Sequence, residues 1–129
     1  MAKEPLVIED LTDGFRFATL LAEHGFPVTA AAWVHEADAE RWRLLIAKPR
    51  DNKESLYESY GRLVGIFRQF GDEIADFDNA KVDIVYDDDP RIVALSEVSP
   101  PLTRNYKRVG GTMYGNVYID EALIYKLAA

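Results

Sequence analysis

The chain has 129 residues, of which 48% are hydrophobic, and its formal net charge is −7. This length and hydrophobic content suit one folded domain and exclude a disordered chain, while the acidity argues against binding to duplex DNA or to anionic membranes. The absence of cysteine excludes disulfides, thiolate zinc sites, iron–sulfur clusters and cysteine nucleophiles. We expect a cytoplasmic protein, because a chain without cysteine suits a reducing compartment and no segment resembles a signal peptide or a membrane span.

The first predicted element is a helix over residues 11–24. Apolar residues recur there at helical spacing, Asp10 or Thr12 is placed to cap its N-terminus, and Gly25 provides a stop. This pattern indicates a helix with one face on a core.

Two strands are predicted next, over residues 28–36 and 41–48. The short polar segment between them indicates a hairpin with a loop of two or four residues. Either length places Trp33 and Trp42 on the same face of the sheet, because side chains alternate along a strand.

A second helix is predicted to begin within residues 51–54, with Asp51 or Asn52 as its N-cap. It carries the clearest periodic signal in the chain, an apolar stripe over five turns. The stripe consists of Leu56, Tyr60, Leu63, Phe67, Phe70 and Ile74. We expect it to pack on the sheet and to end or bend at Gly71.

A third strand is predicted over residues 81–86, and Asp89 and Pro90 then begin a short helix that ends near residue 98. The remainder reads as a strand, glycine turns and a last strand near residues 122–127. The predicted order is α-β-β-α-β-α-β-β. Hairpins flanked by helices indicate a single α+β domain over residues 1–129, with a mixed or mostly antiparallel sheet.

Three segments resemble those of a group of small uncharacterised bacterial proteins. They are GFPVTAAAW at 25–33, ERWRLLIA at 40–47 and IDEALIYKL at 119–127. These motifs are mostly structural in character. The resemblance implies a bacterial source and no particular activity.

The basic segment 104–115 is a candidate site for a small anionic ligand or a nucleotide. Arg104, Lys107 and Arg108 alternate there with aromatic and glycine residues, a mixture typical of phosphate and single-strand sites. No lysine followed by serine or threonine completes a P-loop. The structural alternative is an exposed strand whose bases offset residues 72–97, which carry nine acids against two bases.

Asp87, Asp88 and Asp89 are weak candidates for binding Mg²⁺ or Ca²⁺, since these ions prefer carboxylate oxygens. The structural alternative is that Asp89 caps the following helix and the other two are solvated, and we favour it. The two histidines, His24 and His35, fall in different elements, so no zinc site is predicted. No cofactor and no catalytic residue is identified.

Trp33 and Trp42 are either core residues or ligand and partner contacts, since tryptophan beside arginine is common at interfaces. The apolar last strand indicates a homodimer, because a strand at the end of a chain often forms an open sheet edge. Three functions follow from these features. The first is a non-enzymatic binding or interaction module, the second a small-molecule or nucleotide-binding domain, and the third a divalent-metal-dependent enzyme.

Overall fold

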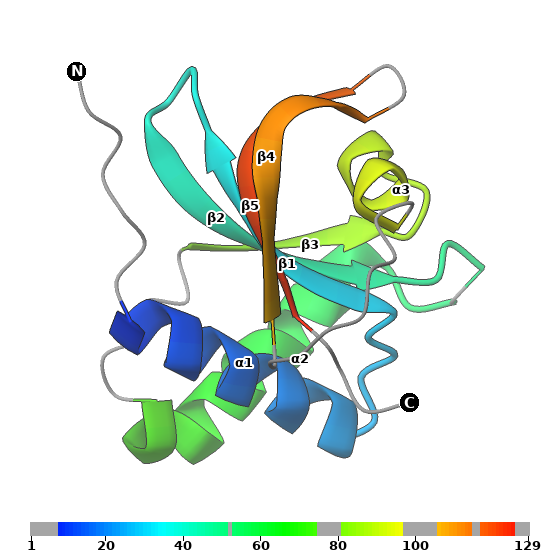
Figure 1. Cartoon of the computed structure of the whole chain (residues 1–129). Helices are drawn as coiled ribbons and strands as arrows, with labels where there is room; N and C mark the ends of the chain where they lie inside the picture. The colour runs from blue at the N-terminus through cyan, green and yellow to red at the C-terminus, as the bar shows by residue number, and fades with distance from the viewer. Residues whose placement is uncertain (1–7, 52, 75–80, 97–105, 115–116, 126–129) are drawn as a thin grey trace.

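The structure is a computed structural model that describes residues 8–51, 53–74, 81–96, 106–114 and 117–125 (Figure 1). Three helices, one 3-10 turn and five strands follow one another along the chain. They are α1 (Ile8–Glu23), β1 (Ala30–Glu36), β2 (Arg41–Lys48), α2 (Leu56–Phe70), η1 (Gly71–Ile74), β3 (Val82–Tyr86), α3 (Pro90–Ser96), β4 (Tyr106–Tyr114) and β5 (Val117–Tyr125). The predicted order of helices and strands is confirmed.

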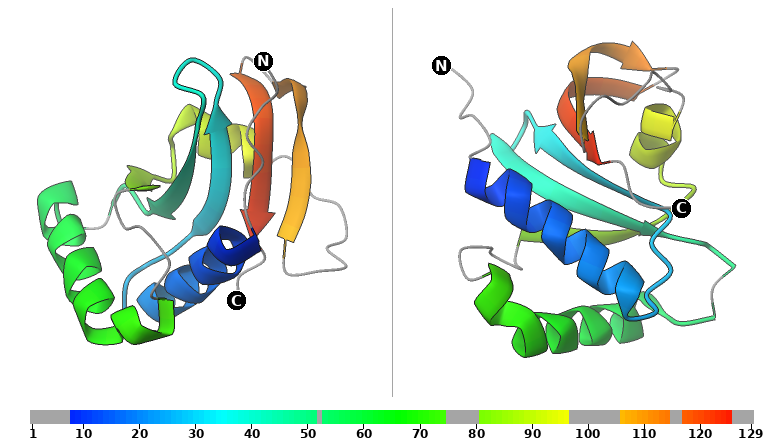
Figure 2. Two further views of the ribbon diagram at one scale, coloured as in Figure 1. Left: turned by 90° about the vertical axis from the view of Figure 1, so that its left-hand side faces the viewer. Right: turned by 60° about the horizontal axis from the view of Figure 1, so that its bottom comes forward.

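The five strands form one sheet in the order β3-β2-β1-β5-β4. β3 runs parallel to β2, and the other neighbours are antiparallel, so the sheet is mixed as predicted. α1 and α2 cover one face, and the short α3 lies on the other (Figures 1 and 2). None of the described helices is long and apolar enough to cross a membrane.

The larger core lies between the sheet and helices α1 and α2, and Trp33 is at its centre with none of its surface exposed. Its indole Nε1 donates to the Tyr125 hydroxyl at 2.7 Å, and that hydroxyl donates to the Leu11 carbonyl of α1 at 2.5 Å. Gly14 lies directly over this pair, because a Cβ there would be only 2.7 Å from Trp33 Nε1. The missing side chain therefore lets α1 approach the sheet closely.

The predicted hairpin is confirmed, with a loop of four residues. Glu36 lies opposite Arg41, and Trp33 opposite Leu44. Trp33 and Trp42 therefore share the face beneath α1 and α2, where both are buried.

Two of the predicted helix starts are wrong. α1 begins three residues earlier than expected, so Asp10 lies inside it, and its carboxylate accepts from Lys81 Nζ at 3.0 Å. α2 is capped by Ser55, whose hydroxyl accepts from the Glu58 amide at 3.1 Å, and not by Asp51. Asn52, the other proposed cap, lies outside the described residues.

Three local predictions are confirmed. Gly25 ends α1 with a φ of 85°. The Asp89 carboxylate caps α3 by accepting from the Arg91 amide at 2.9 Å, with Pro90 at the first helical position. Leu63 lies in the core, whereas Phe67 is only partly buried and packs against its edge.

The last strand is not at an edge of the sheet, which corrects the reason for expecting a dimer. β5 lies between β1 and β4, so the two edges are β3 and β4. On the β3 edge, the Ile84 amide donates to the Tyr60 hydroxyl at 2.9 Å, which covers part of that edge. Self-association therefore stays a prediction, and its open edge would be β4.

The Tyr125 hydroxyl should make the free energy of unfolding depend on pH under alkaline conditions. Burial, reinforced by the nearby carboxylate of Asp10, raises the pKa of Tyr125 well above its usual range. Unfolded tyrosine ionises near pH 10, whereas the folded protein keeps this proton. Stability should therefore be unaffected below about pH 9 and fall above about pH 10, by at most about 1.4 kcal/mol per pH unit.

The Tyr125→Phe variant removes this group and should show a shallower loss of stability between pH 9 and 11, measured by urea unfolding. Equal slopes for the variant and the parent protein would contradict the prediction.

Candidate functional site

The sheet divides into two hairpins near one end. β1 and β5 are paired through only three residue pairs, of which the last joins Val34 to Ala122. Beyond that pair, β1 remains paired with β2, and the first residues of β5 remain paired with β4. The β1–β2 and β4–β5 hairpins then diverge (Figure 1), which leaves their facing strand edges unpaired with each other.

A cleft of about 370 Å³ lies between the two hairpins. Its polar and aromatic lining comes from β1, the hairpin loop, β2, α3 and β5. These residues are His35, Glu36, Asp38, Arg41, Arg91, Tyr118 and Asp120. A volume of this size suits a small ligand or one or two side chains of a partner.

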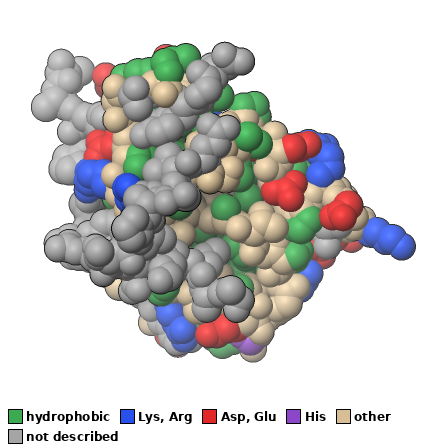
Figure 3. Space-filling view, turned by 45° about the vertical axis from the view of Figure 1, so that its right-hand side comes forward, with side chains coloured by type: hydrophobic (Ala, Val, Ile, Leu, Met, Phe, Trp, Pro, Cys, Tyr) green, Lys and Arg blue, Asp and Glu red, His purple; other side chains and the backbone are tan. Residues whose placement is uncertain are grey.

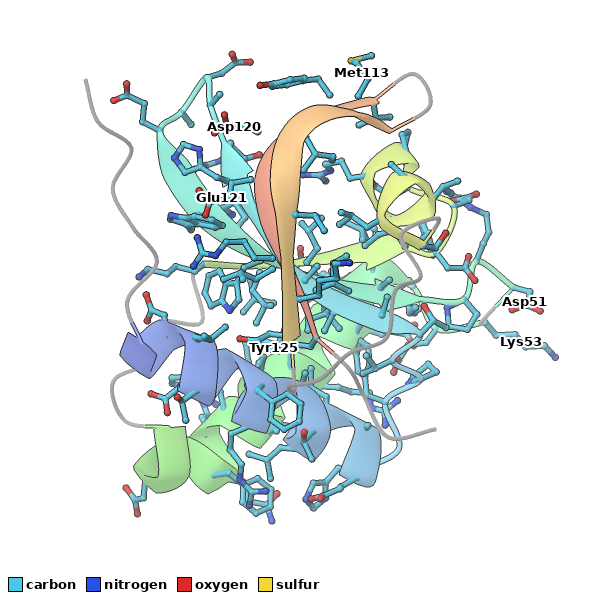
Figure 4. The ribbon with its side chains drawn as sticks, viewed as in Figure 1. Asp51, Lys53, Met113, Asp120, Glu121 and Tyr125 are labelled. Atoms are coloured by element: carbon cyan, nitrogen blue, oxygen red, sulfur yellow. The ribbon has the colours of Figure 1, made fainter. Side chains whose placement is uncertain are left out.

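His35 and Asp120 join the two hairpins across the cleft. The imidazole Nδ1 lies 2.6 Å from Asp120 Oδ2, and the His35 side chain is only 5% exposed. The Trp42 ring packs edge-on against the imidazole at 5.2 Å, which restricts its rotation. Figure 4 shows Asp120 on the upper part of the sheet, well away from the helices α1 and α2.

The Asp120 contact determines which nitrogen of His35 is available. An ionised carboxylate only accepts hydrogen bonds, so Nδ1 carries a proton, and in the neutral form of the ring Nε2 presents a lone pair. Nε2 forms no hydrogen bond with any described residue. Among those residues every fully buried side-chain nitrogen or oxygen has a partner, so the unpaired Nε2 must touch solvent.

Glu36 lies between the two guanidinium groups of the cleft. Its carboxylate accepts from Arg41 Nε at 2.7 Å and lies 3.8 Å from Arg91 Nη1. Arg91 is also paired with Asp89, at 3.2 Å. Asp38, in contrast, forms no ion pair with any residue that the structure describes.

The tip of the β4–β5 hairpin exposes two apolar side chains beside the cleft. Met113 and Tyr118 lie opposite each other on the paired strands and are 55% and 58% exposed. Figure 3 shows hydrophobic side chains at the upper end of the molecule, where this tip lies. Tyr118 also lines the cleft, so its exposed aromatic side chain is within reach of a ligand there.

The two tryptophans proposed as ligand contacts are not on the surface. Trp33 is fully buried and Trp42 is 9% exposed, both beneath the helices. Their burial corrects the expectation of a partner surface that contains tryptophan. Both tryptophans are core residues, which was the alternative interpretation of the sequence.

The two described bases of the basic segment, Lys107 and Arg108, do not form one patch. Lys107 and Arg108 are consecutive on β4, so their side chains point to opposite faces, and Arg108 is paired with Glu121. Gly110 has a structural reason to be glycine, because a Cβ there would lie 2.6 Å from Glu121 Cα. Arg104 lies outside the described residues.

The aspartate run is held by protein groups. Asp89 caps α3, Asp87 accepts from the Arg50 amide at 3.2 Å, and Asp88 pairs with the Arg50 guanidinium at 2.6 Å. This hydrogen bond from Arg50 holds the pKa of Asp88 below its usual range. Acidic and basic side chains lie next to each other along the right-hand edge of Figure 3. The cap that the structural alternative assigned to Asp89 is present, whereas Asp87 and Asp88 bond to Arg50 and are not merely solvated. Within the described ranges no three potential ligands come together to hold a metal.

A buried lysine–serine pair was missed by sequence reasoning. Lys48 Nζ donates to the Ser59 hydroxyl at 2.7 Å, and lysine beside serine is a combination that also occurs in enzymes with a serine nucleophile. Both side chains are completely buried, however, so no substrate reaches them. The pair therefore fastens α2 to the sheet.

Sequence reasoning placed His35 in the first predicted strand but did not connect it with Asp120. The two residues are 85 positions apart, and no local sequence pattern predicts that β1 and β5 are neighbours in the sheet. Arg91 and Tyr118 were missed for the same reason. No protein-family model matches the chain, and neither a curated protein nor a solved structure matches it significantly.

Proposed function

We propose that this protein is a non-enzymatic binding module whose ligand occupies the cleft between the β1–β2 and β4–β5 hairpins. The observation that carries the proposal is the split of the sheet after Val34 and Ala122, which opens a polar cleft of about 370 Å³ between two strand edges. Folded proteins normally fill or close such a gap, because unpaired strand edges invite additional contacts.

The lining supports binding rather than reaction. An aspartate–histidine pair can serve as a general base, and covalent catalysis would also need a side-chain nucleophile beside it. No serine or threonine borders the cleft among the residues described, and no metal-ligand cluster is present there. The oriented His35 ring is therefore interpreted as a fixed hydrogen-bonding group for a ligand.

A thermal-shift screen with nucleotides, amino acids, amines, short oligonucleotides and divalent metals tests this proposal, because a ligand that binds the folded state raises its melting temperature. Two exposed tyrosines provide a matched pair of variants. Tyr118→Ala alters the cleft, whereas Tyr57→Ala removes a ring that is 89% exposed on α2.

At least one compound class should stabilise the parent protein and the Tyr57→Ala variant, and bind the Tyr118→Ala variant about tenfold more weakly, a loss of about 1.4 kcal/mol. NMR spectra of the mixtures should show no conversion of the bound compound. A screen without any stabilising compound, equal binding to both variants or turnover of the compound would each argue against the proposal.

A further inference from the structure

We infer that the cleft binds an organic cation that donates N–H hydrogen bonds, namely an ammonium or guanidinium group. This inference rests on the proposed binding function and names the chemical class of the ligand. It combines three features of the cleft: an acceptor nitrogen on His35, an unpaired carboxylate on Asp38 and an exposed aromatic ring on Tyr118.

The His35 ring is the most specific feature. The His35 side chain is only 5% exposed, and its Nδ1 is bonded to Asp120. Its Nε2 has no partner among the described residues. With the proton on Nδ1, Nε2 can only accept a hydrogen bond. For the neutral ring, the group that completes this site is a donor, as an ammonium or a guanidinium is.

The charges of the cleft favour the same class. Three carboxylates and two guanidinium groups line it. Glu36 and Asp89 already hold the two arginines, whereas Asp38 has no ion pair within the described part of the chain. A cation would meet a carboxylate that has no ion pair, whereas an anion would compete with Glu36 and Asp89 for guanidinium groups that are already paired. The net charge of −7 also attracts cations to the surface.

Tyr118 adds an apolar contact that a hydrated metal ion cannot use in the same way. Its side chain is 58% exposed and lines the cleft. The face of an aromatic ring attracts ammonium and guanidinium groups, and the attraction grows as the cation loses water. An organic cation can thus use the ring, Nε2 and the carboxylate together.

The experiment compares probes of similar length by NMR titration of the full chain. The probes are 1,4-diaminobutane, its fully methylated quaternary analogue, 1,4-butanediol, succinate and Mg²⁺. A further titration uses a Gly-Lys-Gly peptide with an acetylated N-terminus and an amidated C-terminus, whose only cation is the lysine side chain. Comparing it with the diamine shows whether the cleft binds a free amine or a lysine side chain of a peptide. The readouts are the side-chain signals of His35 and the ring signals of Tyr118.

The decisive variants are two exposed aspartates. Asp38→Asn removes the unpaired carboxylate of the cleft, while Asp51→Asn removes one at a distance from Asp120 (Figure 4). The diamine or the lysine peptide should shift the His35 and Tyr118 signals of the parent protein and of Asp51→Asn. Asp38→Asn should bind it about tenfold more weakly. The quaternary analogue, which has no N–H group, should also bind about tenfold more weakly.

Stronger binding of succinate or butanediol in the cleft would overturn the inference while leaving the binding function intact. Equal shifts with Mg²⁺ or with the quaternary analogue, or an Asp38→Asn variant that binds like the parent, would also overturn it. If no probe shifts the cleft signals, and the broader thermal-shift screen is also negative, the proposed function fails together with the inference.

Discussion

Replacing Lys48 with alanine should lower the free energy of unfolding by about 3–5 kcal/mol, because the change breaks a buried charged network and leaves a cavity. The Lys48 side chain is completely buried. Its Nζ donates to the Glu54 carbonyl and to the Ser59 hydroxyl, each at 2.7 Å, and the Glu54 carboxylate lies at 4.0 Å. Urea unfolding of the variant measures the loss.

Lys48→Met separates the charge from the volume, since methionine fills most of the same space. We expect a smaller loss, of about 1–3 kcal/mol, because Ser59 still donates to the Glu54 carboxylate. Lys53→Ala is the matched control, since this lysine is exposed (Figure 4) and its removal should change stability by less than about 0.5 kcal/mol. A Lys48→Ala variant as stable as the control would show that the network does not hold α2 to the sheet.

Introducing a methyl group at Gly14 should destabilise the protein by about 2–4 kcal/mol, although alanine favours helices. The new Cβ would lie 2.7 Å from Trp33 Nε1 and 2.8 Å from the Tyr125 hydroxyl. Neither group moves freely, because they are bonded to each other in the core. Overpacking costs about 1–3 kcal/mol, and disturbing the buried hydrogen bond adds to it. The propensity gain of about 0.5–1 kcal/mol offsets only part of this loss.

Gly65→Ala is the natural control, since it makes the same change in α2 where no atom lies within 4 Å of the new Cβ. That variant should be more stable than the parent by about 0.5–1 kcal/mol. Removing the Tyr125 hydroxyl with Tyr125→Phe should reduce the cost of Gly14→Ala, because one of the two close contacts disappears. Equal effects of the two alanines in chemical denaturation would disprove the packing argument.

The sequence by itself determined the features that depend on neighbouring residues. The polar loop between the first two strands determined the parity of the hairpin, so the shared face of Trp33 and Trp42 was predictable. Asp89 and Pro90 marked the start of α3 because both act within one helical turn. The start of α2 was predicted less well, since several capping residues precede it and only the folded loop selects Ser55.

Only the tertiary structure decided which distant segments meet. The last strand lies inside the sheet because β1 and β4 both pair with it, and its own apolar composition is equally compatible with an edge. The cleft exists because β1 and β5 part after Val34, and the pairing of the two strands up to that point brings His35 close to Asp120, 85 positions away. Such contacts follow from the pairing of whole strands and the twist of the sheet, which no short window of sequence encodes. For that reason the elements could be predicted from the sequence, and the candidate site could not.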